Sequence, residues 1–203
     1  MILQLKTGGF DSNFSYLAFE ENSKEGFIID PCGDTSIIEK AVADNNVKVK
    51  YVINTHGHRD HIEGNNAVLK ATKAQLAIHE ADTTTPAENV ILLNGGETLK
   101  AGLTEIKIYH TPGHTAGSIC IQFENGLFTG DTLFVDWCGY AEDKRKLYNS
   151  LQNIVRNFAD NLIVYSGHDY GKTPTALLSH EKKYNPYLKI QDFDSFLNEY
   201  KNL

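Results

Sequence analysis

Three histidines and an aspartate lie within six positions of one short segment, NTHGHRDH (residues 54–61), which directly follows the apolar run VKYVI. The whole chain contains only eight histidines. In an extended backbone alternate residues point the same way, so His56 and His58 can reach one metal ion. Asp60 and His61 open a helical pattern that turns them toward the same pocket, displaced from the first pair. The spacing predicts a strand that ends in two groups of metal ligands, unlike the helical H-E-x-x-H motif.

Three later segments supply the further ligands that such a site needs. The segment YHTPGHT leaves a strand-like run through a Pro/Gly turn that can present His114 inward. The run LFTGD ends in Asp131, a carboxylate able to bridge two cations, and IVYSGH ends in His168. Each residue follows a strand terminus, where open sheets generally place their sites. We therefore expect all of these side chains in one pocket.

Apolar, β-rich runs alternate with helical patterns along the chain. The expected strands are residues 14–19, 26–31, 49–54, 104–110, 118–123, 126–131 and 162–168. The expected helices are residues 34–45, 60–73, 144–158, 173–185 and 192–200. This mixture indicates an α/β fold in which sheets lie between helices. Because no Pro/Gly/Ser-rich linker interrupts the sequence, we predict a single domain over residues 1–203, with a short helical tail at about 190–203.

The motifs H-x-H-x-D-H, T-P-G-H-T, G-D-T-L-F and G-H-D-Y, in this order, resemble those of the metallo-β-lactamase-fold superfamily. Within it the chain is most similar to the branch of glyoxalase II (hydroxyacylglutathione hydrolase) and persulfide dioxygenase. The resemblance extends from GFIIDP to YNPYL, which is most of the chain. It implies an αβ/βα sandwich of two facing mixed sheets flanked by helices, with the metals at one edge.

The resemblance also implies the metal ligands. The first metal site falls on His56, His58 and His114. The second falls on Asp60, His61 and His168, with Asp131 bridging. Imidazole and carboxylate ligands suit two divalent ions, zinc first and iron or manganese as alternatives. The implied reaction is attack of a metal-bound hydroxide on a thioester carbonyl, with Asp60 as a catalytic ligand that orients the nucleophile.

A second enzyme class fits much of the same ligand set. In a mononuclear-iron persulfide dioxygenase, only His56, His114 and Asp131 would bind Fe(II), leaving positions for the persulfide and O₂. The motif G-D-T-L-F and the G-H pair favour the hydrolases, whereas H-D-Y favours the dioxygenases. We predict a glyoxalase II-like thioester hydrolase, with the sulfur oxidoreductase as the alternative.

The segment VDWCGYAEDK departs from the branch in a way that concerns the substrate. Cys138 and Gly139 match, but Tyr140 stands where the relatives carry a basic residue. The chain also ends near residue 203, without the longer C-terminal domain that supplies basic glutathione-binding residues. Tyr170, in contrast, matches an aromatic position that contacts the thiol substrate in relatives. We predict a small-molecule thioester or thiol-derived substrate, with Tyr140 and Tyr170 as contacts. The departures leave three alternatives open: a glutathione thioester, a thioester of another small thiol carrier, or a different acyl compound.

Charge and cysteine usage limit the partners. A net charge of −7 argues against binding to nucleic acid or to an anionic membrane surface. No apolar run approaches the roughly 18 residues of a transmembrane helix, and the N-terminal segment lacks a signal-peptide pattern. Three widely spaced cysteines suit a reducing compartment. We expect a cytoplasmic protein; its oligomeric state is not predicted.

Several other polar residues receive structural interpretations. Asp30, in FIIDP, is expected to hold the strand end near the metal loop through hydrogen bonds. His79 is expected to pack at a strand end or support the site from behind, and His180 is expected on the surface of a helix. Cys120 alternates with apolar neighbours and is expected to be a core thiol.

Overall fold

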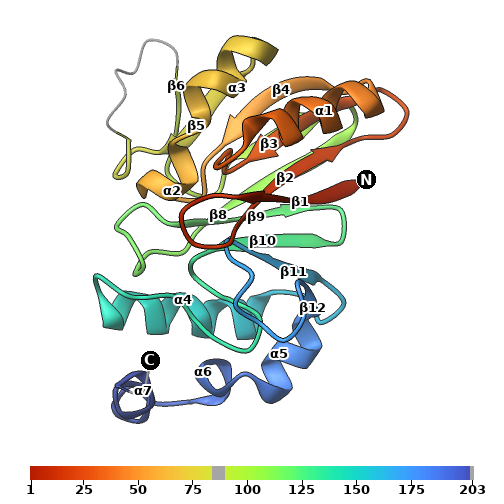
Figure 1. Ribbon diagram of the computed structural model, residues 1–203. Helices are drawn as coiled ribbons and strands as arrows, with labels where there is room; N and C mark the ends of the chain where they lie inside the picture. The colour runs from red at the N-terminus through yellow and green to blue at the C-terminus, as the bar shows by residue number, and fades with distance from the viewer. Residues whose placement is uncertain (84–89, 202–203) are drawn as a thin grey trace.

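The computed structural model describes residues 1–83 and 90–201, which form two six-stranded sheets packed face to face between layers of helices (Figure 1). The first sheet has the order β1 (Ile2–Gly8), β2 (Asn13–Phe19), β3 (Glu25–Ile29), β4 (Lys48–Ile53), β5 (Gln75–His79), β6 (Val90–Leu93). The second has the order β12 (Ala176–Leu177), β11 (Ile163–Ser166), β10 (Gly126–Gly130), β9 (Ile119–Phe123), β8 (Thr104–His110), β7 (Thr98–Ala101). The predicted sandwich of two mixed sheets is confirmed.

Both sheets combine parallel and antiparallel pairs. Strands β3 to β6 are parallel to one another, whereas β1, β2 and β3 pair antiparallel. In the second sheet only β10 and β11 are parallel. Parallel neighbours end at the same edge of a sheet, so the loops that leave β3 and β4 lie together, as do those that leave β10 and β11.

Aromatic side chains fill the space between the sheets. Rings of Phe27 and Phe123, which belong to opposite sheets, pack edge to face with centroids 5.1 Å apart. Tyr16 and Phe128 make an equivalent contact across the sheets, also at 5.1 Å. Strand β2 is buried along its whole length because its alternate residues face this core and the helices outside it. Each such ring contributes about 1.5–3 kcal/mol by leaving water.

Helices cover the outer face of each sheet. The first sheet carries α1 (Thr35–Asn45), α2 (Arg59–Ile62) and α3 (Asn65–Thr72). The second carries α4 (Lys144–Asn157), α5 (Leu178–Tyr184), α6 (Pro186–Lys189) and α7 (Phe193–Tyr200). Helix α4 buries Leu147, Leu151 and Ile154, whose spacing of four and three residues forms one apolar stripe. None of the helices in the described part of the chain is long and apolar enough to cross a membrane.

Two predicted helix boundaries are wrong. The helix expected over residues 60–73 is divided into α2 and α3 at Gly64, whose N–H donates to the carbonyl of Pro31 at 2.9 Å. A Cβ at Gly64 would lie 2.6 Å from that oxygen, so the close approach requires glycine. The helix expected over residues 173–185 begins only at Leu178, because residues 176–177 pair with β11 as β12.

The strands that the sequence did not reveal are chiefly the edge strands β1, β6, β7 and β12, together with β5. Edge strands have one unpaired side and partly exposed side chains, so no continuous apolar run marks β1 or β7. Strand β6 is apolar throughout but only four residues long, and it was missed. In the C-terminal tail, Phe196 and Tyr200 of α7 are buried against α4 and α6. Residues 202–203 lie outside the described residues.

Candidate metal centre

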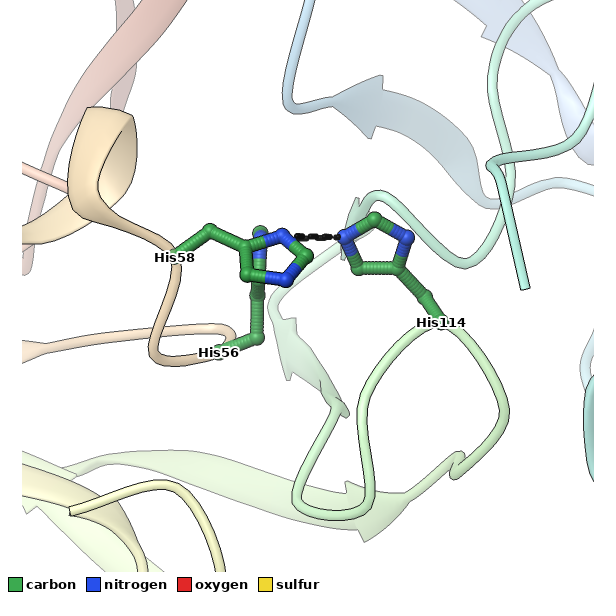
Figure 2. A group of neighbouring side chains, drawn as sticks. All are labelled: His56, His58 and His114. Carbon is green, nitrogen blue, oxygen red and sulfur yellow. Dashed lines mark hydrogen bonds between the residues drawn. The ribbon is translucent and has the colours of Figure 1, made fainter. Parts of the chain in front are cut away.

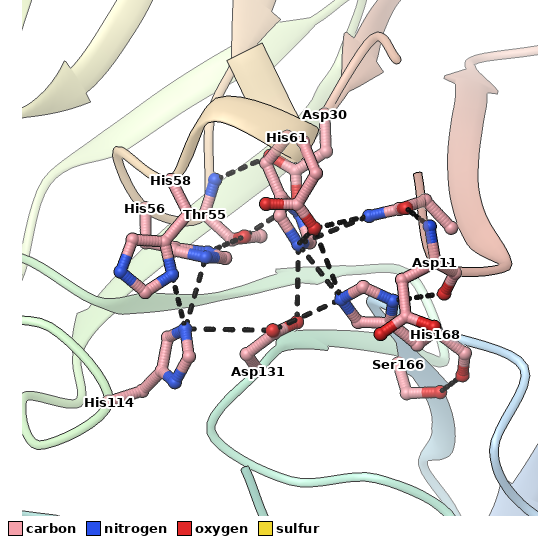
Figure 3. Close-up of polar contacts among 12 residues, drawn as sticks. Asp11, Asp30, Thr55, His56, His58, His61, His114, Asp131, Ser166 and His168 are labelled. Atoms are coloured by element: carbon pink, nitrogen blue, oxygen red, sulfur yellow. Dashed lines mark hydrogen bonds and ion pairs between the residues drawn. The ribbon is translucent and has the colours of Figure 1, made fainter. Parts of the chain in front are cut away.

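The seven side chains predicted as metal ligands lie together at one edge of the sandwich, although they come from four separate loops. Figure 3 shows the histidines of this group and Asp131. The loop after β4 and the short helix α2 bring four of them, and the loop between β8 and β9 brings His114. Asp131 follows β10 and His168 follows β11. Each of these segments follows the end of a strand, and Asp60 and His61 lie in the helix that comes after β4, as the sequence predicted.

Three imidazoles form the first cluster (Figure 2). The Nε2 atom of His114 lies 3.1 Å from Nε2 of His56 and 2.9 Å from Nδ1 of His58. Two imidazole nitrogens that face one another can share only one proton. Hydrogen bonds among the three rings therefore cannot satisfy all three of these nitrogens. A metal ion is a common partner that all three lone pairs can serve.

The second cluster combines a carboxylate with two imidazoles. His61 Nε2 lies 3.2 Å from His168 Nε2 and 3.4 Å from Asp60 Oδ2. His168 Nε2 lies 3.6 Å from the same carboxylate oxygen. This mixed set of hard oxygen and borderline nitrogen ligands suits Zn²⁺, Fe²⁺ or Mn²⁺.

Asp131 lies between the two clusters. Its Oδ2 atom is 3.5 Å from His114 Nε2 and 3.2 Å from His168 Nε2, while Oδ1 is 3.4 Å from His61 Nε2. Oδ1 is buried and has no hydrogen-bond partner among the described residues. A buried, unsatisfied carboxylate oxygen is costly unless a cation meets it. The residues present therefore fit a pair of divalent cations with this carboxylate between them.

Backbone and carboxylate acceptors hold the outer nitrogens of three of the histidines. Nδ1 of His114 faces the carbonyl of Tyr140 at 2.7 Å, and Nδ1 of His168 faces the carbonyl of Asp11 at 2.7 Å. Nδ1 of His61 faces Asp30 Oδ2 at 2.9 Å. Such acceptors fix the imidazole tautomer and leave the inner nitrogen free to bind a metal.

Asp30 has the structural role expected from the sequence. Its carboxylate accepts hydrogen bonds from the backbone N–H of Thr55 at 2.7 Å and from the Thr55 hydroxyl at 2.6 Å. Its backbone has a φ of 47°, in the left-handed region that non-glycine residues rarely adopt. These contacts fasten the end of β3 to the start of the first histidine loop.

Two positioning residues escaped the sequence analysis. Asp82 accepts hydrogen bonds from the N–H groups of Gly57 at 3.0 Å and Gly117 at 2.7 Å, and so ties the loop of the first histidines to that of His114. Asn13 donates from Nδ2 to Asp60 Oδ2 at 2.9 Å. No motif includes either residue, because their partners lie 25 to 47 positions away in the chain.

Burial and charge act differently on the two clusters. Burial holds the pKa of His56 well below its usual value, because the charged imidazolium loses hydration. Burial has the same tendency at His61, but the carboxylates of Asp131 and Asp30 outweigh it and raise the pKa of that imidazole well above its usual value. Burial favours protonation of Asp131, yet His61 and His168 keep the pKa of this carboxyl well below its usual range. Burial thus dominates at His56 in the first cluster, whereas the neighbouring carboxylates dominate at His61 in the second.

A hollow of about 480 Å³ opens beside the clusters. Its lining consists of His114, Asp131, Phe134, Trp137, Cys138, Tyr140 and Tyr170. The ring of Tyr170 stacks on His168 at 4.8 Å, and its hydroxyl donates to the Asp11 carboxylate. Both tyrosines predicted as substrate contacts therefore lie next to the candidate ligands, and their contact with substrate stays a prediction.

The other histidines do not join the clusters. His79 is buried and stacks on His110 at 4.2 Å, and His110 Nε2 lies 3.0 Å from the carbonyl of Ala116. His180 is exposed on α5. Cys120 is a buried core thiol as expected, and burial raises its pKa to about 12.

Comparison with known proteins gives consistent matches over most of the chain. A family model described as "Metallo-beta-lactamase superfamily" matches residues 8–168. A hydroxyacylglutathione hydrolase from Pelagibacter ubique (strain HTCC1062) is 33% identical over 183 residues, covering 88% of this chain and 76% of the relative. A probable polyketide biosynthesis zinc-dependent hydrolase from Bacillus subtilis (strain 168) is 29% identical over 193 residues, covering 92% of this chain and 86% of the relative.

Among solved structures, ETHE1 from Myxococcus xanthus superposes with a TM-score of 0.88 and 26% sequence identity. The match covers 100% of this chain and 90% of that one. The similarity thus includes both sheets and every loop that contributes to the two clusters.

Proposed function

The chain belongs to the metallo-β-lactamase superfamily, and on that premise we propose that it is a metal-dependent thioester hydrolase of the glyoxalase II type. The reaction adds the oxygen of water to the acyl carbon and breaks the carbon–sulfur bond. The acyl group leaves as a carboxylic acid and the sulfur as a thiol that takes up the second proton of water. Two divalent cations, zinc first and iron or manganese as alternatives, would supply a water of lowered pKa and polarise the carbonyl.

The observation that carries the proposal is the unpartnered Oδ1 of Asp131 between two triads of ligand-type side chains. In the proposal His56, His58 and His114 hold one cation. Asp60, His61 and His168 hold the other, and Asp131 contacts both. A single structural ion would need only one closed set of four ligands, whereas two triads with a shared carboxylate leave positions for water and substrate.

Asp60 has a second proposed role as the residue that orients the attacking water. One of its oxygens accepts from Asn13, and the side chain is only partly buried, so it remains reachable by water. Tyr140 and Tyr170 are proposed to contact the thiol part of the substrate, because both line the hollow beside the clusters. The proposed partner is therefore a small thioester, with neither nucleic acid nor a membrane involved.

The test is elemental analysis of protein purified without added metal, combined with assays of thioester hydrolysis and of O₂ uptake with a persulfide. We expect about two metal ions per chain and thioester turnover. One iron per chain with O₂ consumption would replace the hydrolase by the sulfur oxidoreductase. In that case the iron would be bound by His56, His114 and Asp131. The Nε2 atom of His114 lies 3.1 Å from Nε2 of His56 and 3.5 Å from Oδ2 of Asp131.

A further inference from the structure

The hollow beside the metal clusters has an aromatic wall. Trp137 and Tyr140 are 45% and 67% exposed, and Tyr170 is 42% exposed, so their rings are available to a ligand. Phe134 packs edge to face against Tyr170 with centroids 5.1 Å apart. Among the described residues, the lining includes no lysine or arginine. The wall therefore offers stacking surface and no cation that could pair with a carboxylate of the substrate.

The wall is held in place by hydrogen bonds from the C-terminal helices. Asn185 Nδ2 donates to the carbonyl of Trp137 at 3.0 Å, and the Tyr200 hydroxyl donates to the carbonyl of Gly139 at 3.3 Å. The carbonyl of Tyr140 faces Nδ1 of His114 at 2.7 Å. These contacts fix the backbone that presents the rings, so a ligand would meet a preformed surface with little ordering cost.

Lys172, two positions after Tyr170, lines a different hollow together with Asp136. The cations that follow Tyr140 most closely in the sequence pack against another part of the chain. Lys144 Nζ lies 5.0 Å from the centroid of the Tyr200 ring, and the Arg145 guanidinium lies 3.3 Å from that of Phe193. Both rings belong to α7, so cation–π contacts hold these side chains against the C-terminal helix. Arg59 lines a different hollow, which it shares with Asp60 and Glu63.

We propose that the hollow selects thioesters whose thiol part is uncharged and aromatic, with Trp137 and Tyr140 as the residues that determine this specificity. The inference rests on the proposed thioester hydrolysis and names its substrate class. A stacked aromatic ring gains a contact that an aliphatic chain lacks, whereas a carboxylate on the wall loses hydration without gaining an ion pair. A peptide thiol with two carboxylates, such as glutathione, is therefore a poor fit.

The test compares acetyl thioesters of three alkyl thiols: 2-phenylethanethiol, N-acetylcysteamine and glutathione. The first is uncharged and aromatic, the second uncharged and non-aromatic, and the third charged. We expect kcat/KM to be highest for the phenylethyl thioester, by roughly tenfold over the other two. Trp137→Ala should lower only the phenylethyl value, by about fivefold and through KM, with metal content unchanged. Tyr140→Arg should raise the value for the glutathione thioester.

Binding provides a second readout that does not depend on turnover. Trp137 is the only tryptophan of the chain, so intrinsic fluorescence reports directly on the wall. The S-methyl thioethers of the three thiols cannot be hydrolysed, and we expect only the phenylethyl compound to shift the emission at low concentration. Tyr184→Ala, which removes an exposed ring outside this hollow, is the matched control and should change neither readout.

The outcomes separate the two proposals. Equal rates for the phenylethyl and N-acetylcysteamine thioesters would overturn aromatic selection, and a preference for the glutathione thioester would overturn the inference entirely. Absence of all hydrolysis together with a selective fluorescence shift would overturn the hydrolase and support the aromatic site. Absence of both signals would overturn both.

Discussion

Asp131 and Glu181 are two buried carboxylates that differ in their surroundings. In the described part of the chain they are the two residues with a buried side-chain oxygen that lacks a hydrogen-bond partner. Each also lies in a group of histidines and carboxylates close enough to share a cation: Asp131 beside the two triads, and Glu181 with Asp136 and His180. By the distances between their side chains alone, both groups could hold a cation.

The environment of Asp131 preserves its charge, and that of Glu181 opposes it. Imidazoles surround Asp131 and keep the pKa of its carboxyl well below the usual range despite burial. Glu181 is 0% exposed, and burial raises the pKa of its carboxyl. Its other oxygen accepts from the N–H of Asp136 and from Asn185 Nδ2, both at 2.9 Å.

The difference shows why the two carboxylates have different uses. A cation is attracted where negative charge is maintained in a buried place, which describes Asp131. Glu181 acts as a clamp instead: through Asp136 and Asn185 it joins the loop after β10 to α5 and α6. Glu181 thus supports the aromatic wall, and the charged carboxylate of Asp131 belongs to the candidate metal centre.

The largest expected effect comes from Asp131→Asn. The substitution keeps the shape of the side chain and removes its charge, so the metal content should fall and thioester hydrolysis should decrease by more than about 100-fold. Elemental analysis and initial rates measure the two quantities on the same sample. Full metal loading in this variant would contradict the shared-carboxylate role.

The next largest effects are expected from variants that each remove a ligand from one cluster only. His114→Ala and His168→Ala each remove one ligand from a different triad, so each should reduce about two metal ions per chain to about one. Circular dichroism checks that both variants keep the fold. If either variant loses both ions, the two sites bind as one unit and Asp131 is not a simple bridge.

Glu181→Gln should have a smaller effect that depends on pH. Burial raises the pKa of Glu181 in the folded state above its value in the unfolded chain. The protonated carboxyl therefore stabilises the wild-type fold fully below the unfolded pKa, and this contribution to the free energy of unfolding is lost as the pH rises through the folded pKa. The amide cannot ionise, so the variant should gain stability relative to the wild type as the pH rises. Urea unfolding at a series of pH values measures this. Metal content should not change, and a loss of metal would mean that Glu181 binds a cation.

His180→Ala should have the smallest effect. The side chain is exposed on α5 and lies outside the two triads, so activity and metal content should equal those of the wild type, and stability should change by less than about 0.5 kcal/mol. A large loss of activity would place the reaction beside Asp136 and Glu181 instead of Asp131.

The sequence predicted the interior of the fold better than its margins. Strands such as β4 and β8 are paired on both edges and have one face that is more buried than the other, so apolar and polar residues alternate along them in a pattern that the sequence shows. The edge strands and the break at Gly64 depend on contacts with distant residues, such as the carbonyl of Pro31. Local patterning cannot encode such contacts, so these boundaries were missed or wrong.

By itself, the sequence determined the order of the histidines and aspartates that are predicted to bind metal, and their local spacing. The motif spacing places His56 and His58 on one side of an extended segment, and Asp60 and His61 at the start of a helix, through local backbone geometry alone. Only the tertiary structure decided what holds these ligands in place. Asp82 and Asn13 act across 25 to 47 residues, and the charge of Asp131 depends on imidazoles from other loops. Hydrogen bonding and desolvation depend on three-dimensional neighbours, and these exist only once the two sheets have packed.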